Sequence, residues 1–99
     1  MPEPFKTIVR VTKAEYIDEA DSILLEGSCE HGIARHQMHS SAFSFDSFFT
    51  GKETEQEKKT IKIREMRKTA QMWIGKNTEM VFDPDLDLRI KANAALKYR

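Results

Sequence analysis

The chain has 99 residues, of which 39% are hydrophobic and 32% are charged, so we expect one soluble globular domain spanning residues 1–99 and exclude a disordered chain. The net charge is zero, yet residues 1–57 carry a net charge of −6 and residues 58–99 a net charge of +6. No apolar run approaches the roughly 20 residues of a membrane span. No signal peptide is recognisable and the lone Cys29 cannot form an internal disulfide, which together predict a cytoplasmic protein.

The first predicted element is a strand from Phe5 to Ile17. Its apolar residues begin on one face and change phase at Ala14 and Tyr16. A phase change within a strand is typical of a β-bulge, which lets a sheet curl towards a barrel. An acidic turn is expected at residues 18–22, because its composition is typical of turns.

Two further strands are expected to form a hairpin. The second strand begins at Ile23 and reaches about Cys29, and the third covers residues 33–40. The short loop between them contains Gly32, which can adopt the positive φ that hairpin loops require.

A long helix is expected after an irregular segment, residues 40–52, that is rich in phenylalanine. Both Thr54–Glu57 and Thr50–Glu53 fit a capping box, so two starting points remain open. Apolar residues at helical spacing follow, and Gly75 stands where a helix would end.

The last fifteen residues show the strongest pattern. Apolar and polar residues alternate along residues 86–98, with Ala95 as the one lapse. In a strand this alternation places the two classes on opposite faces, whereas in a helix it scatters the apolar residues around the axis. We therefore predict a short fourth strand at residues 79–82, a break at 83–85 and a long final strand.

Three strands, a helix and two strands follow one another in the order of an OB-fold, a five-stranded and partly open barrel. We therefore expect a mainly β protein with one long helix, resembling an OB-fold-like five-stranded small barrel. An α+β fold with a C-terminal helix is the alternative. A final strand much longer than the fourth would leave an unpaired edge, so a homodimer through an edge strand is also considered.

Four potential zinc ligands lie within eleven residues: Cys29, His31, His36 and His39. On an extended strand His36 and His39 point to opposite faces, and no CxxC pair is present, so we predict no metal site and no cofactor. The acidic residues of 18–21 and 83–85 would meet at the mouth of the barrel and could hold a divalent cation, which makes a metal-dependent nuclease a less favoured alternative. No nucleophile–base pair is visible, so we do not expect an enzyme.

The basic residues carry the functional prediction. Residues 58–76 hold seven Lys/Arg and one acid, and a row of cations is what a phosphate backbone requires. Bases additionally stack on aromatic side chains. The predicted nucleic-acid-binding residues lie on the helix and on the outward face of the final strand: Arg64, Arg67, Lys68, Arg89, Lys91, Lys97, Tyr98 and Arg99.

Two functions are consistent with this charge layout. We expect a small non-catalytic binding module that contacts single-stranded nucleic acid through these basic residues. The alternative is a protein–protein interaction adaptor or inhibitor, whose oppositely charged halves match a charged protein partner. No membrane partner is expected in either case.

Overall fold

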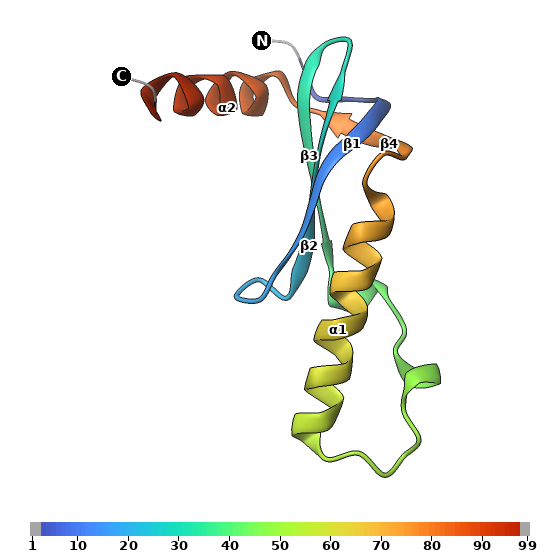
Figure 1. Cartoon of the computed structure of the whole chain (residues 1–99). Coiled ribbons are helices and arrows are strands. Elements are labelled where there is room, and N and C mark those ends of the chain that lie inside the picture. The colour runs from blue at the N-terminus through green and yellow to red at the C-terminus, as the bar shows by residue number, and fades with distance from the viewer. Residues whose placement is uncertain (1–2, 98–99) are drawn as a thin grey trace.

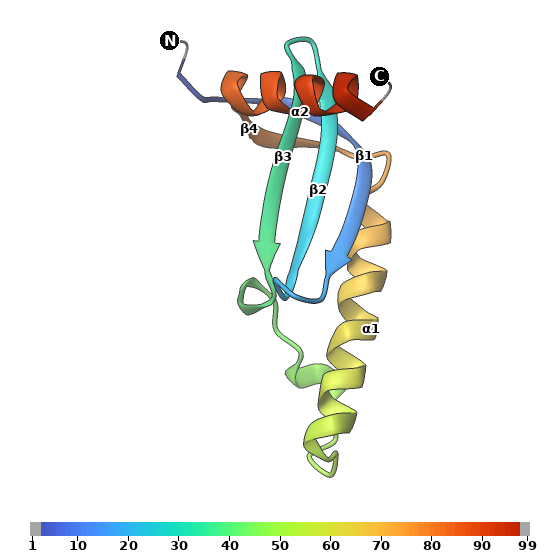
Figure 2. The same cartoon turned by 90° about the vertical axis from the view of Figure 1, so that its left-hand side faces the viewer.

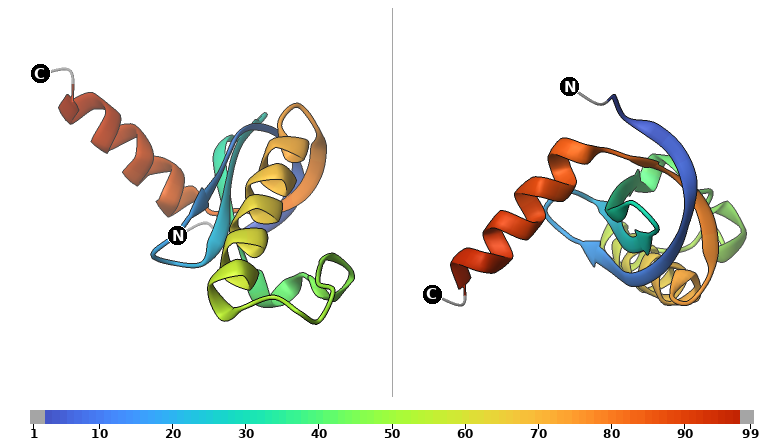
Figure 3. Two further views of the ribbon diagram at one scale, coloured as in Figure 1. Left: turned by 60° about the horizontal axis from the view of Figure 1, so that its bottom comes forward. Right: turned by 90° about the horizontal axis from the view of Figure 1, so that it is seen from above.

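A curled, four-stranded antiparallel sheet forms the centre of the molecule in the computed structural model, which describes residues 3–97 (Figure 1). The sheet order is β3-β2-β1-β4, and the sheet curls into a half-barrel (Figure 3). In chain order the elements are β1 (Phe5–Ile17), β2 (Ser22–Cys29), β3 (Gly32–His39), the short 3₁₀ turns η1 (Ser40–Ala42) and η2 (Asp46–Phe48), α1 (Glu55–Trp73), β4 (Asn77–Phe82) and α2 (Pro84–Lys97).

Strand β1 contains the predicted bulge. Val11 pairs with Gly27 and Lys13 with Glu26, so Thr12 is the extra residue on β1. Residues 5–10 of β1 pair with β4, and residues 10–17 pair with β2, with the bulge near the point of change. The bulge therefore lets one long strand serve both halves of a bent sheet, as the change of phase predicted.

The core lies between the inner face of the sheet and helix α1. Inward-facing residues of all four strands meet two fully buried residues of the helix, Met66 and Ala70, and Trp73 packs at the edge of the cluster. The buried residues contributed by the sheet are Val9, Val11, Ala14, Ile23, Leu25, Ala34, Met80 and Phe82. One helix is thus enough to cover the concave side of the half-barrel.

Helix α1 begins at Thr54–Glu57, one of the two predicted capping boxes. The Thr54 side chain accepts a hydrogen bond from the Glu57 amide, and the Glu57 carboxylate accepts one from the Thr54 amide. The Thr50–Glu53 pair makes similar contacts but does not start a helix. At the other end Gly75, with φ of 86°, donates from its amide to the Val11 carbonyl oxygen at 2.8 Å and ties the helix end to the bulge.

The prediction of a final strand is wrong, because Pro84–Lys97 form helix α2. Asp83 starts the helix: its carboxylate accepts from the Asp85 amide and its carbonyl from the Asp87 amide, both at 3.0 Å. Pro84 at the first helical position and acidic residues in the first turn reinforce this start. These local signals, together with the strong helix formers Ala, Leu and Lys, outweigh the alternating pattern.

The described chain therefore has four strands and not five, and the OB-fold-like barrel is not confirmed. The alternative, an α+β fold with a C-terminal helix, is confirmed. The long edge strand that motivated the homodimer prediction is absent from residues 3–97, where the sheet edges are β3 and β4. No helix in the described part of the chain has the length and apolar character needed to cross a membrane.

Helix α2 projects from the sheet on the side opposite α1 (Figures 1 and 2). It is anchored through the buried Asp87, whose carboxylate accepts a hydrogen bond from the Ile33 amide at 2.8 Å and pairs with Lys91 at 3.0 Å. Gly32 makes room for this contact, since a Cβ there would lie 2.5 Å from the Asp87 carboxylate. As the alternating sequence implies for a helix, α2 does not bury all of its apolar residues, and Leu88 is 64% exposed.

Candidate functional site

A pocket with a volume of about 750 Å³ lies at the end of the sheet remote from α2. Three segments enclose it: the β1–β2 turn, the N-terminal half of α1, and the chain from His39 to Phe49. We call residues 43–49 of this chain the aromatic segment. Segments far apart in sequence therefore form one concave surface.

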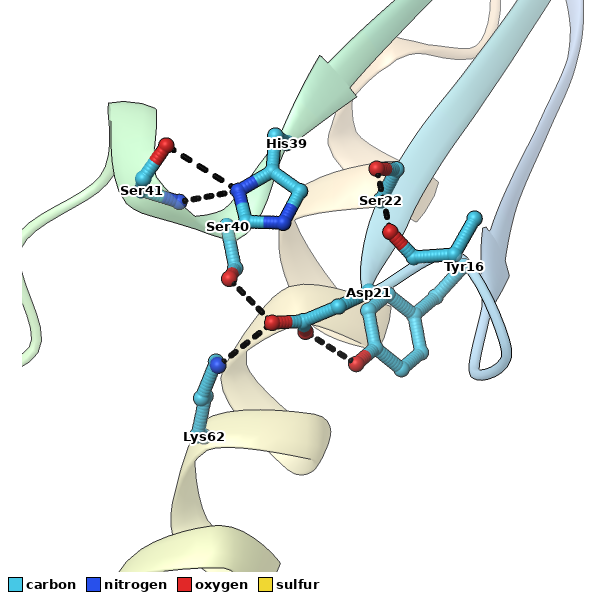
Figure 4. A network of polar contacts seen from close by, with 8 residues as sticks. Tyr16, Asp21, Ser22, His39, Ser40, Ser41 and Lys62 are labelled. Atoms are coloured by element: carbon cyan, nitrogen blue, oxygen red, sulfur yellow. Dashed lines mark hydrogen bonds and ion pairs between the residues drawn. The ribbon is translucent and has the colours of Figure 1, made fainter.

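Asp21 joins these segments (Figure 4). Its carboxylate accepts hydrogen bonds from the Tyr16 hydroxyl at 2.6 Å, the Ser40 hydroxyl at 2.5 Å and the Lys62 ammonium at 2.7 Å. Its carbonyl oxygen also accepts from the Ser40 amide at 2.9 Å. Asp21 has a φ of 47°, a left-handed conformation that aspartate tolerates better than most residues. The carboxylate thus fixes β1, the turn, η1 and α1 relative to one another.

The electrostatics of this network follow from its hydrogen bonds. Burial alone would raise the pKa of Asp21, but the donors Lys62, Ser40 and Tyr16 outweigh it and hold the pKa well below its usual range. Desolvation, together with the hydrogen bond to Asp21 and its charge, raises the pKa of Tyr16 to about 12. Asp21 is therefore ionised and Tyr16 neutral across the physiological range, and both are committed to structure.

One wall of the pocket is apolar. Phe43 and Phe45 are half-buried and pack against the core, whereas Phe49 lines the pocket without belonging to that core cluster. Ile63 of α1 also lines the pocket. An open pocket with aromatic walls can take a flat ring, because ring faces stack with one another.

The rim of the pocket carries charged and polar groups. Lys58 lies 3.7 Å from Glu55, a weak contact, and Lys59 forms no ion pair with any described residue. His39 and Asp18 also line the pocket. Lys62 is held by Asp21, so Lys58 and Lys59 are the lysines left to meet a ligand.

The helix residues predicted from sequence lie elsewhere on α1. Arg64, Arg67 and Lys68 are exposed, and Glu65 is within 3.7 Å of Arg64 and 3.5 Å of Lys68. Arg64 and Lys68 lie roughly 140° to 180° around the helix from Lys59. Arg67 alone is near the site, since its charge acts on Tyr16 and opposes the rise in the pKa of that hydroxyl.

The predicted C-terminal residues do not form one outward face. Arg89 and Lys91 are exposed on α2, but they are two residues apart and so point in directions about 200° apart around the helix. Lys91 also pairs with Asp87. The side chain of Lys97, and Tyr98 and Arg99 altogether, lie outside the described residues. We call Arg64, Arg67 and Lys68 the basic face of α1. Helix α2 lies on the other side of the sheet from α1, so the structure does not bring the two predicted sets together (Figure 2).

The acidic turns predicted to converge are also separated. Residues 18–21 follow the end of β1, whereas residues 83–85 follow Phe82, which pairs with Phe5 at the start of β1. The thirteen residues of β1 span about 40 Å. Within residues 3–97 no group of three or more His, Cys, Asp or Glu side chains is arranged to hold a metal ion.

Sequence reasoning missed the pocket as a site, although its components were visible. From the sequence, the four phenylalanines of residues 43–49 are expected to plug one end of the core, or to stack on bases where they are exposed. Lys58, Lys59 and Lys62 count there only as part of a basic stretch. Their spacing puts these three lysines on one side of a helix that starts at Glu55. That signal, next to an aromatic segment, could have indicated the pocket.

The search for related proteins gives no support for any function. No protein family matches the chain, and neither the characterised proteins nor the solved structures include a match. We therefore infer the function from the geometry and chemistry of the pocket.

Proposed function

We propose that the protein is a non-catalytic module that binds single-stranded nucleic acid at this pocket. The supporting observation is that aromatic rings and uncommitted lysines line the same open cavity. Single-stranded nucleic acid offers a flat base and a charged phosphate in every unit, and proteins bind it by combining stacking with cationic contacts.

The pocket accommodates both parts of a nucleotide unit. Its volume of about 750 Å³ is within the range of small-ligand sites. A base stacks against the aromatic segment, where Phe49 is the one of the three pocket-lining rings that lies outside the core cluster. The phosphate stays at the rim, where Lys58 and Lys59 meet it and the ionised Asp21 is already neutralised by Lys62.

The basic face of α1 has a secondary part in this proposal. Arg64, Arg67 and Lys68 increase the positive potential around the helix and thereby speed the association of a polyanion. Direct contact is expected first at Lys58 and Lys59, because the base-stacking rings lie on their side of the helix.

The test is fluorescence anisotropy of a labelled single-stranded oligonucleotide at several salt concentrations. The double variant Lys58→Glu/Lys59→Glu should weaken binding at least about tenfold. The slope of log K against log salt concentration should become less steep by about 0.7 for each lost phosphate contact. The matched control, Arg64→Glu/Lys68→Glu, changes the net charge equally on the opposite face and should have a clearly smaller effect. Equal binding by the wild type and the Lys58→Glu/Lys59→Glu variant would refute the pocket as the site.

A protein-interaction module is the second candidate, and exposed apolar residues away from the pocket favour it. Leu88 on α2 and Ile8 on the outer face of β1 are 64% and 62% exposed. Exposed apolar residues indicate a protein contact where they gather into one patch, and Leu88 and Ile8 are the positions at which to test for one. This function predicts a stoichiometric protein complex that is lost in Leu88→Asp, with no oligonucleotide binding at low salt.

A further inference from the structure

Helix α2 carries apolar residues on two of its sides. Residues two positions apart point about 200° apart around a helix, whereas residues four positions apart point only about 40° apart. The alternation of apolar and polar residues therefore becomes two apolar rows when it is wound into a helix. One row begins with Leu86 and Ile90, and the other begins with Leu88 and Ala92. Because the rows lie on opposite sides of the helix, one neighbouring surface cannot cover both.

The two rows differ in burial. Leu86 and Ile90 are half-buried and lie on the side of the helix that carries the buried Asp87, which bonds to β3. Leu88 and Ala92, which we call the outer row, are exposed, and α2 projects away from the sheet (Figures 1 and 3). A helix of 14 residues is only marginally stable in water by itself, because most helical stability comes from packing an apolar face. A partner on the outer row would therefore stabilise α2.

The sequence of this segment is self-complementary about Ala92. Leu96 stands as far after Ala92 as Leu88 stands before it. In the same way Arg99 stands as far after Ala92 as Asp85 stands before it. A second copy of the segment that runs antiparallel, with a two-fold axis at Ala92, therefore matches apolar with apolar positions and acidic with basic positions. A parallel copy would instead match acid with acid and base with base.

We propose that the outer row of α2 binds the outer row of a second copy of this chain in an antiparallel, two-fold symmetric pair. Opposed helix macrodipoles favour this direction as well, and the small side chain of Ala92 at the axis lets the helices approach closely. Two helices about 21 Å long bury less than the roughly 1,200 Å² of a standard interface, so the dimer is weak, with a Kd on the order of 0.1 mM. The pocket lies at the remote end of the sheet, so this inference does not depend on the proposed function.

The first test is sedimentation velocity at protein concentrations from about 10 μM to about 1 mM, which bracket the expected Kd. The wild type should change from monomer to dimer over this range. Leu88→Glu puts a charge into the outer row and should remain a monomer that is folded by circular dichroism. Ile8→Glu is the matched control, since Ile8 is 62% exposed on the outer face of β1, and it should form the dimer. A wild type that is monomeric at about 1 mM, or equal loss of the dimer in both variants, would refute the proposal.

The second test is disulfide cross-linking in a Cys29→Ser background, and it reports the direction of the pair. In Ala92→Cys the two thiols face each other at the two-fold axis, so mild oxidation should give a linked dimer. In Asp85→Cys the two thiols of an antiparallel pair lie about 21 Å apart along the axis, so little linked dimer should form. Equal linking at both positions would indicate a parallel or random association, and no linking in Ala92→Cys would exclude the axis. Either result would contradict the proposed pair.

Discussion

The Lys62 ammonium lies 2.7 Å from Asp21 Oδ2 and so joins helix α1 to the β1–β2 turn across 41 positions of sequence. Both side chains are about one-third exposed, so water weakens the pair but does not replace it. Tyr16 and Ser40 complete the hydrogen bonding of the same carboxylate. This carboxylate therefore links three of the elements that border the pocket.

Replacing Asp21 with alanine should destabilise the fold by about 1–3 kcal/mol, because three donors then lose a charged acceptor. The measurement is the urea midpoint followed by circular dichroism. Glu19→Gln is the matched control, since Glu19 is an exposed residue of the same turn with no hydrogen bond among the described residues. Similar midpoints for Asp21→Ala and Glu19→Gln would contradict the role of the carboxylate.

The pH dependence of stability should separate the two titrating members of the network. The pKa of Asp21 is lower in the folded than in the unfolded chain, so its contribution is complete above the ordinary aspartate pKa of about 4 and is lost as pH falls below it. The pKa of Tyr16 is raised to about 12, so its contribution is complete below about pH 10 and is lost between there and pH 12. Unfolding at a series of pH values should show the acid loss shrinking in Asp21→Asn and the alkaline loss shrinking in Tyr16→Phe. The remaining acid loss comes from Glu53 and Asp87, because backbone hydrogen bonds lower the pKa of both carboxyls as well.

The two possible helix starts give a third prediction. Because α1 begins after Thr54, Thr54→Ala should cost about 1 kcal/mol, whereas Thr54→Ser keeps the hydroxyl and should be nearly neutral. Thr50→Ala should cost less, since Thr50 caps no helix. If Thr50→Ala lost more stability than Thr54→Ala in thermal unfolding, the assignment of the helix start to Thr54 would be wrong.

The attachment of α2 depends on one carboxylate and can be tested separately from the pocket. In Asp87→Ala the Ile33 amide loses its acceptor, and in Gly32→Ala the new Cβ displaces the Asp87 carboxylate. Both changes should speed amide hydrogen exchange throughout α2 and leave exchange in the Met66 region of α1 unchanged. Asp85→Asn, in the same helical turn but exposed, should leave the exchange of α2 nearly as in the wild type.

Local patterns predicted much of this fold correctly. The change of phase in β1 gave the bulge, Gly32 marked the hairpin, and Gly75 marked the end of α1. Each of these signals acts within a few residues, where backbone geometry leaves little choice. At α2 the alternation of apolar and polar residues predicts a strand, whereas the Asp83–Pro84 start signal predicts the helix that is observed.

The candidate site was less accessible to sequence reasoning, because tertiary contacts form it. Asp21 was visible as one acid in an acidic turn, but its partners Ser40 and Lys62 lie 19 and 41 positions away. Likewise the predicted basic set combined α1 with a strand that is instead a helix on the other side of the sheet. The spacing of charged residues along the sequence does not show which of them form ion pairs across such separations.

The central claim is that single-stranded nucleic acid binds in the pocket beside α1. Its most direct test is a titration of isotope-labelled protein with unlabelled oligo(dC), followed by amide chemical shifts. We expect the largest shifts in residues 39–49 and 58–63 and in the β1–β2 turn, with little change along α2. Largest shifts on α2 or on the outer face of the sheet, or no shifts at low salt, would contradict it.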